Sequence, residues 1–232
     1  MTGSIVTPDL RARVRGLALP VARGLGRLGL TPNHLTLIGF GIAIVAAGAA
    51  AAGAWLAAGI LVIVGGVFDL FDGALARSRG QATRLGAFFD SVFDRWGEGV
   101  VYIGIAWGCA RADFLEGSVL ATAALASSFM VSYARAKSES LGFTPGTRMA
   151  AIGLAPREVR IVIVTLALLV AGGAGSVTVG SEPCFLPGGA VCPITLSTGA
   201  LGLAIGLGLI AVLATITTIQ RILHVVRQAR ED

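Results

Sequence analysis

Long uninterrupted runs of apolar residues dominate the chain. The longest run covers the 34 uncharged residues from Leu35 to Phe68, which as a single helix would extend roughly 51 Å. A helix needs only about 20 residues to cross a membrane, so we expect two spans that meet near 51–53, beside Trp55. Because the runs are continuous rather than alternating, they predict helices and not the strands of a barrel.

Four further apolar segments follow this first pair. The predicted spans are residues 35–51, 54–71, 85–110, 117–134, 161–179 and 196–219. The pattern therefore predicts an all-α integral membrane protein with six transmembrane helices, in which residues 1–232 form a single membrane domain.

An amphipathic helix is predicted over residues 9–30, before the first span. Its apolar positions recur at helical spacing with arginines between them, and they are Leu10, Val14, Leu17, Val21, Leu25 and Leu28. Such a stripe is typical of a helix that lies at the cytoplasmic interface of the bilayer. A frayed basic tail is the alternative.

The composition excludes several classes of protein. Only 13% of the residues are charged and 55% are hydrophobic, whereas a soluble domain carries about 25% charged residues. A soluble globular protein, a disordered chain and a nucleic-acid-binding module are excluded, and no nucleic-acid partner is expected. The natural partner of this surface is a lipid bilayer.

The basic residues are distributed unevenly between the two sides of the predicted spans. Of the 18 lysines and arginines, all except Arg111 fall on the side that also holds both termini. Because cytoplasmic segments carry the excess of basic residues, we expect a multi-pass protein of the plasma membrane with both termini in the cytoplasm. The formal net charge of +5 then reflects topology.

Three cysteines are present. Cys184 and Cys192 lie in the Gly- and Pro-rich segment between the last two spans, which the charge count places outside the cell. An oxidising exterior favours a disulfide between them, but sequence does not supply the required geometry, so two free thiols remain the alternative. Cys109 is interpreted as a small packing residue.

Acidic residues occur inside the predicted spans, where charge is costly and usually functional. Asp69 and Asp72 share one face of the second span, and Asp90, Asp94 and Glu98 follow one another at intervals of four on the third. Because a short connection makes these spans antiparallel neighbours, four aspartates can face each other. Two Mg²⁺ ions, or Mn²⁺ in their place, would neutralise such a cluster.

Two other interpretations of these carboxylates are open. They are a structural ion-pair network with Arg77, Arg84 and Arg95, and the proton path of a proton-coupled transporter. Neither requires the small residues that surround the aspartates. Gly73 and Gly86 let a ligand approach the backbone closely, and Arg77 offers a planar donor group to a diphosphate.

The full string is Asp69-x2-Asp72-Gly73-x2-Ala76-Arg77-x8-Gly86-x3-Asp90-x3-Asp94. It resembles the signature of the CDP-alcohol phosphatidyltransferase family at each of its eight specified positions. The resemblance implies a metal-dependent enzyme of phospholipid biosynthesis, which transfers a phosphatidyl group from CDP-diacylglycerol to a hydroxyl and releases CMP. It also implies a homodimer and an active site at the cytoplasmic interface.

The resemblance further implies a role for each motif residue. Asp69, Asp72, Asp90 and Asp94 match the family's metal ligands, and Asp94 also matches the general base. The matches to the CDP-binding residues are Gly73, Ala76, Arg77 and Gly86. The segment Thr31-Pro32-Asn33-x2-Thr36 resembles the cytidine-side segment, which adds Asn33 and Thr36 to the CDP-binding set. An ordinary helix start, with proline near its first position, is the alternative for that segment.

The acceptor is predicted from basic residues at the cytoplasmic ends of the fourth and fifth spans. These stretches contain Ser132, Arg135, Lys137, Arg157 and Arg160. Converging cations favour a phosphorylated polyol, because arginine and lysine bind phosphate through charge-assisted hydrogen bonds. The alternative is ordinary flanking charge of the cytoplasmic side.

These stretches are similar to those of the phosphatidylinositol phosphate synthases within the family, which implies inositol 1-phosphate as the acceptor. Three features differ from that branch. Arg135 and Lys137 exchange their usual order, Glu158-Val159 stands where Pro-Glu is usual, and the loop from Ser138 to Pro156 is longer than expected. Glycerol 3-phosphate as acceptor, giving phosphatidylglycerol phosphate, and a soluble CDP-inositol donor are therefore the alternatives.

Overall fold

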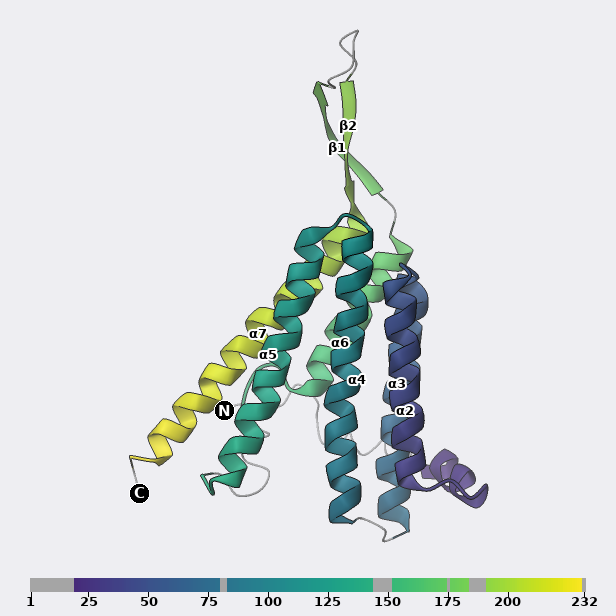
Figure 1. Ribbon diagram of the computed structural model, residues 1–232, viewed down its shortest axis with the longest axis vertical. Coiled ribbons are helices and arrows are strands. Elements are labelled where there is room, and N and C mark those ends of the chain that lie inside the picture. The colour runs from purple at the N-terminus through teal and green to yellow at the C-terminus, as the bar shows by residue number, and fades with distance from the viewer. Residues whose placement is uncertain (1–18, 80–82, 144–151, 175, 184–190, 231–232) are drawn as a thin grey trace.

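The protein is a bundle of long helices from which a β hairpin extends (Figure 1). The computed structural model describes residues 19–79, 83–143, 152–174, 176–183 and 191–230. Its main helices are α2 (Pro32–Ala51), α3 (Trp55–Ser78), α4 (Arg84–Arg111), α5 (Leu115–Ser140), α6 (Arg157–Gly173) and α7 (Thr198–Gln228).

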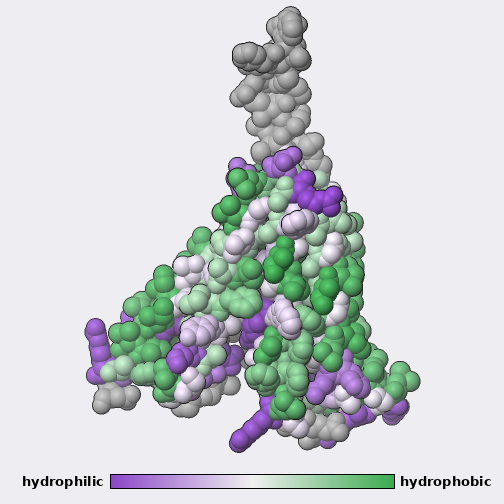
Figure 2. All heavy atoms as spheres, viewed as in Figure 1, coloured by the Kyte–Doolittle hydropathy of each residue, from purple (hydrophilic) through white to green (hydrophobic). Residues whose placement is uncertain are grey.

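The helical part has the surface of a membrane protein. Helices α2, α3, α5 and α7 are long and apolar enough to cross a membrane. Large apolar side chains such as Ile103, Trp107 and Ile205 are exposed, and hydrophobic residues cover the middle of the bundle while hydrophilic ones gather near its ends (Figure 2). A soluble protein does not expose apolar surface on this scale.

Side-chain caps set several of the helix starts. Thr31 caps α2 by accepting a hydrogen bond from the backbone of His34, and Pro32 follows in the first turn. Thr83 accepts from the backbone N–H of Gly86 and caps α4 in the same way. The turn between α2 and α3 contains Gly53 with φ +80°, a conformation that glycine adopts without steric cost.

Helices α2 and α4 approach each other at backbone distance. A β-carbon on Gly104 would run into the backbone of Ala47, and one on Gly108 would run into the backbone of Ala50. The two glycines are four residues apart and form the small-xxx-small pattern that allows close packing of helices in lipid. This contact fixes α4, which carries three of the acidic residues, against α2.

The second half of the chain completes the bundle. Helix α5 packs against α4 and α7, and α6 packs against α3 and α7. The largest buried cluster includes Tyr102, Ile105, Leu168, Leu207 and Ile210, which come from α4, α6 and α7. Helix α6 is thus held between α3 on one side and α7 on the other.

The segment between α6 and α7 differs from the all-α expectation. Strands β1 (Ser176–Pro183) and β2 (Val191–Ser197) pair in antiparallel fashion, with an irregularity in register between Thr178 and Gly180. Runs rich in valine, isoleucine and threonine favour strands over a loop, which accounts for the difference. Cys184 lies outside the described residues, so the expected disulfide with Cys192 stays a prediction.

The predicted N-terminal helix is described only in part. Residues 19–27 are helical, whereas 9–18 lie outside the described residues. Ala22 packs in a small cluster with Leu35 of α2 and Ala74 and Leu75 of α3. The guanidinium of Arg79 donates to the backbone carbonyls of Gly26 and Leu30, so this helix is attached to the end of α3.

Candidate active site

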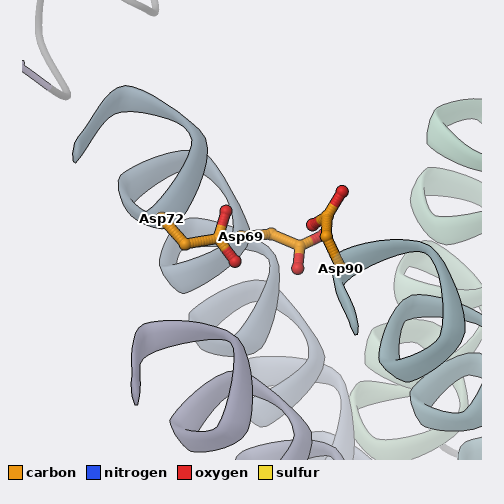
Figure 3. Close-up of side chains that lie close together, drawn as sticks. All are labelled: Asp69, Asp72 and Asp90. Atoms are coloured by element: carbon orange, nitrogen blue, oxygen red, sulfur yellow. The ribbon is translucent and has the colours of Figure 1, made fainter. Parts of the chain in front are cut away.

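Carboxylates from α3 and α4 meet at the end of the bundle where these helices are joined. Asp69, Asp72 and Asp90 each present an oxygen within 4.8 Å of the other two. Asp69 and Asp72 extend from α3 toward Asp90 on α4 (Figure 3). The spacing of three residues places the two α3 carboxylates on one helix face, and the antiparallel pairing supplies the third.

The start of α2 reaches the same cluster. Thr36 is buried, and its hydroxyl donates to Asp72 Oδ2 at 2.8 Å. Asn33 lies next to Gly86, where a β-carbon would be 3.6 Å from Asn33 Oδ1 and 3.1 Å from Thr83 Oγ1. Pro32 and Thr31 form the helix start that the alternative predicted, and that start also places Thr36 against Asp72 and Asn33 beside Gly86.

Arg157, at the first turn of α6, connects the two acidic helices. Its Nη1 donates to Asp69 Oδ2 and lies 2.9 Å from Asp94 Oδ2. Arg95 Nη1 is 3.3 Å from the same Asp94 oxygen. Asp94 Oδ1 and Arg157 Nε are buried, and neither has a hydrogen-bond partner.

These residues fit a divalent cation. Hard cations such as Mg²⁺ and Mn²⁺ take carboxylate oxygens as ligands, and three such oxygens converge from Asp69, Asp72 and Asp90. Asp94 Oδ1 adds a buried acceptor that lacks a partner, and an unsatisfied buried acceptor is costly unless a ligand completes it. Four carboxylates with one bridging arginine leave negative charge that cations would neutralise.

The remaining motif residues lie on the last turns of α3. Arg77 is exposed, and a β-carbon on Gly73 would lie 3.1 Å from Arg77 Nη1. The guanidinium therefore lies over Gly73, one turn away along the helix. Ala76 is partly buried beside it. A larger residue at Gly73 would require the Arg77 guanidinium to shift slightly.

Arg160 occupies a different environment from Arg157. It is 1% exposed and forms a two-pronged ion pair with Glu98, with Nε–Oε1 at 2.7 Å and Nη2–Oε2 at 2.8 Å. Its Nη1 donates to the backbone carbonyl of Ala155 at 2.9 Å. Whereas the sequence indicated a residue that faces the acceptor phosphate, the structure directs these donors to Glu98 and Ala155.

The other predicted acceptor residues lie on the last turns of α5. Arg135 pairs with Glu139 at 2.8 Å, Lys137 is exposed, and Ser132 donates to the carbonyl of Ser128 at 3.4 Å. Arg135 is close enough to Arg95 for their charges to repel each other, and Arg95 also experiences the charge of Arg157. Basic groups from α4, α5 and α6 therefore surround one region.

A cleft opens beside the carboxylates. Thr36, Asp69, Asp94 and Arg157 line its polar part. Apolar residues of four helices line the remainder, among them Ala43 of α2, Val62 of α3, Val101 of α4 and Val164 of α6. The site thus offers a charged end and an apolar wall within one space, which suits an amphipathic substrate.

Sequence reasoning missed several polar residues that support the site. Glu98 was noted without a role, and Thr217 and Arg221 of α7 were read only as part of a span and its flanking charge. Both α7 residues are buried and hydrogen-bond the segment before α6. The available signal was the cluster Thr215, Thr217 and Thr218 near the end of an otherwise apolar run.

The chain matches known proteins over most of its length. Residues 29–227 match the family described as CDP-alcohol phosphatidyltransferase. An archaetidylinositol phosphate synthase of Pyrococcus horikoshii is 39% identical over 163 residues, which are 69% of this chain and 80% of that protein. A phosphatidylinositol phosphate synthase of Mycobacterium tuberculosis is 35% identical over 218 residues, 93% of this chain and 88% of that one.

Solved structures of the Mycobacterium tuberculosis enzyme have the same fold. The crystal structure with CDP-DAG bound has a TM-score of 0.72 at 29% identity, over 90% of this chain and 92% of that chain. The complex with manganese and citrate has a TM-score of 0.70 at 29% identity, over 90% and 88% of the two chains. With its motif residues gathered at one end of the bundle, the chain belongs to the CDP-alcohol phosphatidyltransferase family.

Proposed function

We propose that this enzyme transfers the phosphatidyl group of CDP-diacylglycerol to a hydroxyl of inositol 1-phosphate and releases CMP. The observation that carries the proposal is the position of Arg157, a cation between Asp69 and Asp94 whose buried Nε has no partner. A phosphorylated acceptor would complete that donor. The relatives named above differ in their lipid and share inositol phosphate in their names.

The donor's nucleotide is assigned to the junction of α2, α3 and α4. Asn33, Thr36, Gly73, Ala76, Arg77 and Gly86 would bind CDP. Arg77 is an exposed cation whose guanidinium lies over Gly73, and its fork of donors suits a diphosphate. The small residues at 73 and 86 leave the backbone accessible. The acyl tails would extend toward the bilayer while the nucleotide stays at its surface.

Divalent metal is the cofactor, and four aspartates are assigned to hold two ions. They are Asp69, Asp72, Asp90 and Asp94, with Mg²⁺ as the first candidate and Mn²⁺ as the second. When bound, such ions neutralise charge that develops on a transferring phosphoryl group. Thr36 orients the Asp72 carboxylate by its 2.8 Å hydrogen bond, and it thereby fixes one ligand before any ion arrives.

Asp94 is assigned the role of general base. Its Oδ1 is buried and unpartnered, while its Oδ2 is held by Arg157 and Arg95. Oδ2 is thus held in ion pairs, and Oδ1, the oxygen that would also border a bound cation, is the one that would take the proton of the acceptor hydroxyl. The hydroxyl oxygen then bonds to the β-phosphorus of CDP-diacylglycerol, and the bond to CMP breaks. Arg157 would hold the acceptor phosphate within reach.

The other acceptor residues are divided by their surroundings. Ser132, Arg135 and Lys137 at the end of α5 are assigned to the acceptor with Arg157, because they lie on the last turns of one helix and Arg135 is close to Arg95, beside Arg157. Arg160 is assigned to positioning, since Glu98 and Ala155 already engage its donors. An arginine committed to a buried carboxylate has little capacity left for a substrate phosphate.

The proposal includes a location and an assembly. Residues 1–232 would form one domain with six spans, including α4 and α6, in the plasma membrane. Both termini and the carboxylate end would face the cytoplasm, because all basic residues except Arg111 belong to that side. The N-terminal helix would lie at the interface, and two copies would form a homodimer through helix faces rich in small residues.

The proposal is tested by acceptor-dependent release of CMP. Purified protein is incubated with CDP-diacylglycerol and Mg²⁺, and inositol 1-phosphate or glycerol 3-phosphate is added in parallel. We expect release with inositol 1-phosphate only, with loss of most of that activity in Arg157→Ala. Arg111→Ala, at the opposite end of α4, is the matched control.

Three outcomes would change the conclusion. Release with glycerol 3-phosphate only would keep the reaction and replace the acceptor. If CMP were released from water-soluble CDP-inositol in the presence of a lipid alcohol, and not from CDP-diacylglycerol, the donor would be reassigned. Transport of a solute without formation of CMP would contradict the enzymatic proposal altogether.

A further inference from the structure

The turn that precedes α6 is hydrogen-bonded to α7, and the hydroxyl of Thr217 makes two of these bonds. Thr217 Oγ1 accepts hydrogen bonds from the backbone N–H groups of Leu154 and Ala155, both at 3.0 Å. The same hydroxyl donates to the carbonyl of Leu213 at 2.8 Å. A hydroxyl has one donor and two acceptor positions, so Thr217 uses its full capacity at this place.

The surrounding contacts show that the turn fits closely around Thr217. Gly153 has φ +123°, and a β-carbon there would collide with the Thr217 side chain. Arg221, one turn further along α7, donates through Nε to the carbonyl of Ile152 at 3.1 Å. Thr217 is fully buried and Arg221 is 4% exposed. These contacts leave the turn little freedom to shift.

The turn leads directly into the residues that face the carboxylates. Pro156 caps α6, and Arg157 follows as its first residue. The backbone N–H of Ala155 donates a hydrogen bond to Thr217, and its carbonyl accepts one from Arg160. Ala155 is therefore linked to α7 directly and to Glu98 of α4 through Arg160. Arg157 therefore extends from a backbone that α7 and α4 fix jointly.

We propose that Thr217 is a positioning residue for the acceptor: it fixes the 152–155 turn so that Arg157 reaches Asp69 and Asp94 with its Nε open to the acceptor phosphate. Helix α7 contributes no residue to the cleft, and it acts on the site through this turn. The inference rests on the proposed function, since it concerns binding of the phosphorylated acceptor.

The test removes the hydroxyl without changing the shape of the side chain. Thr217→Val leaves the N–H groups of Leu154 and Ala155 without their acceptor, which is unfavourable for buried donors. Thr217→Ser retains the hydroxyl and is the rescue variant. Thr218→Val is the matched control, because Thr218 is buried beside it and donates to Ala214 of its own helix at 3.0 Å.

We expect Thr217→Val to raise KM for inositol 1-phosphate about tenfold, with KM for CDP-diacylglycerol within about twofold of the unmodified enzyme. Thr217→Ser and Thr218→Val should keep both constants. Thermal unfolding of each variant in detergent shows that folded protein is compared. If Thr217→Val does not accumulate, Thr217→Ala removes the same hydroxyl with less steric demand.

An equal effect on both KM values, or identical behaviour of Thr217→Val and Thr218→Val, would overturn the inference. Failure of the proposed function is a separate result, since it is seen in the unmodified enzyme as absence of CMP release with inositol 1-phosphate. If glycerol 3-phosphate is then the acceptor, the same comparison of KM values is made with it.

Discussion

At the scale of single residues, the site is organised by the pairing of opposite charges across helices. Arg157 forms ion pairs with Asp69 and Asp94, whereas Arg160, three residues later, forms one with Glu98. Both arginines extend from the first turn of α6, yet only Arg157 keeps an unpartnered nitrogen. Two residues with the same side chain and nearly the same position are therefore assigned different functions.

Asp94→Asn tests the proposed general base. The amide keeps the size of the side chain but has little capacity to accept the proton, so CMP release should fall by at least about a hundredfold. CDP-diacylglycerol binding and the unfolding temperature should change little. Steady-state CMP release and a binding measurement with the same preparation separate these effects. Activity near that of the unmodified enzyme would contradict the assignment.

Disruption of the Glu98–Arg160 pair tests its structural role. Arg160→Ala leaves a buried carboxylate without its partner, which costs about 3–5 kcal/mol of stability. The double replacement Glu98→Leu with Arg160→Met removes both charges and should restore much of that loss, because a buried pair contributes little net stability. Thermal unfolding in detergent measures both variants. Equal stability of Arg160→Ala and the unmodified protein would refute the structural role.

At the scale of helices and strands, glycines determine how closely the acidic helix approaches its neighbour. Gly104 and Gly108 put the backbones of α4 and α2 in contact. Helix α2, held against α4 in this way, also packs on α3 and places its Thr36 next to Asp72. The carboxylate cluster therefore depends on backbone contacts that lie several helical turns away from it.

Gly104→Ala tests this dependence. The added methyl group would meet the backbone of Ala47, so α2 and α4 must separate, and we expect a lower unfolding temperature together with reduced CMP release. Gly48→Ala is the control, because nothing lies within 4 Å of a β-carbon at that position of α2. There, alanine gains up to about 1 kcal/mol in helix propensity. Similar unfolding temperatures for the two variants would contradict the argument.

The sequence was informative where spacing along one helix determines proximity. Intervals of three and four residues put Asp69 with Asp72 and Asp90 with Asp94, and the short connection between α3 and α4 brought the two pairs to the same end. Contacts between distant segments could not be read in this way. Arg160 and Glu98 are 62 residues apart, and nothing in either local pattern identifies the partner.

The turn before α6 and the β hairpin illustrate the same limit. Thr217 binds a turn whose shape depends on the positive φ of Gly153, and a glycine in a sequence does not reveal its conformation. The segment between α6 and α7 is rich in glycine and proline, which favours a loop, but its β-branched residues favour the strands that the structure shows. Helix α7 continues to Gln228, beyond residue 219, where the predicted membrane span ends.

At the scale of the whole molecule, the distribution of charge predicts which end faces the cytoplasm. Ser140 at the end of α5 lies on the basic side, and Ala112 after α4 lies on the side of Arg111. Both residues are exposed. Because α4 and α5 are joined by a short turn and run antiparallel, these two positions lie at opposite ends of the bundle.

Single cysteines at these positions test the topology. Cys109→Ala, Cys184→Ser and Cys192→Ser provide a background without thiols, to which Ala112→Cys or Ser140→Cys is added. With a membrane-impermeant thiol reagent, we expect Ala112→Cys to be labelled in intact spheroplasts of the expression host and Ser140→Cys only after permeabilisation. The reverse pattern would place the carboxylates outside the cell, where cytoplasmic CDP-linked lipid headgroups could not reach them. The positive-inside distribution requires the first pattern, and the proposed reaction requires it too, since Asp94 lies toward the Ser140 end of the bundle.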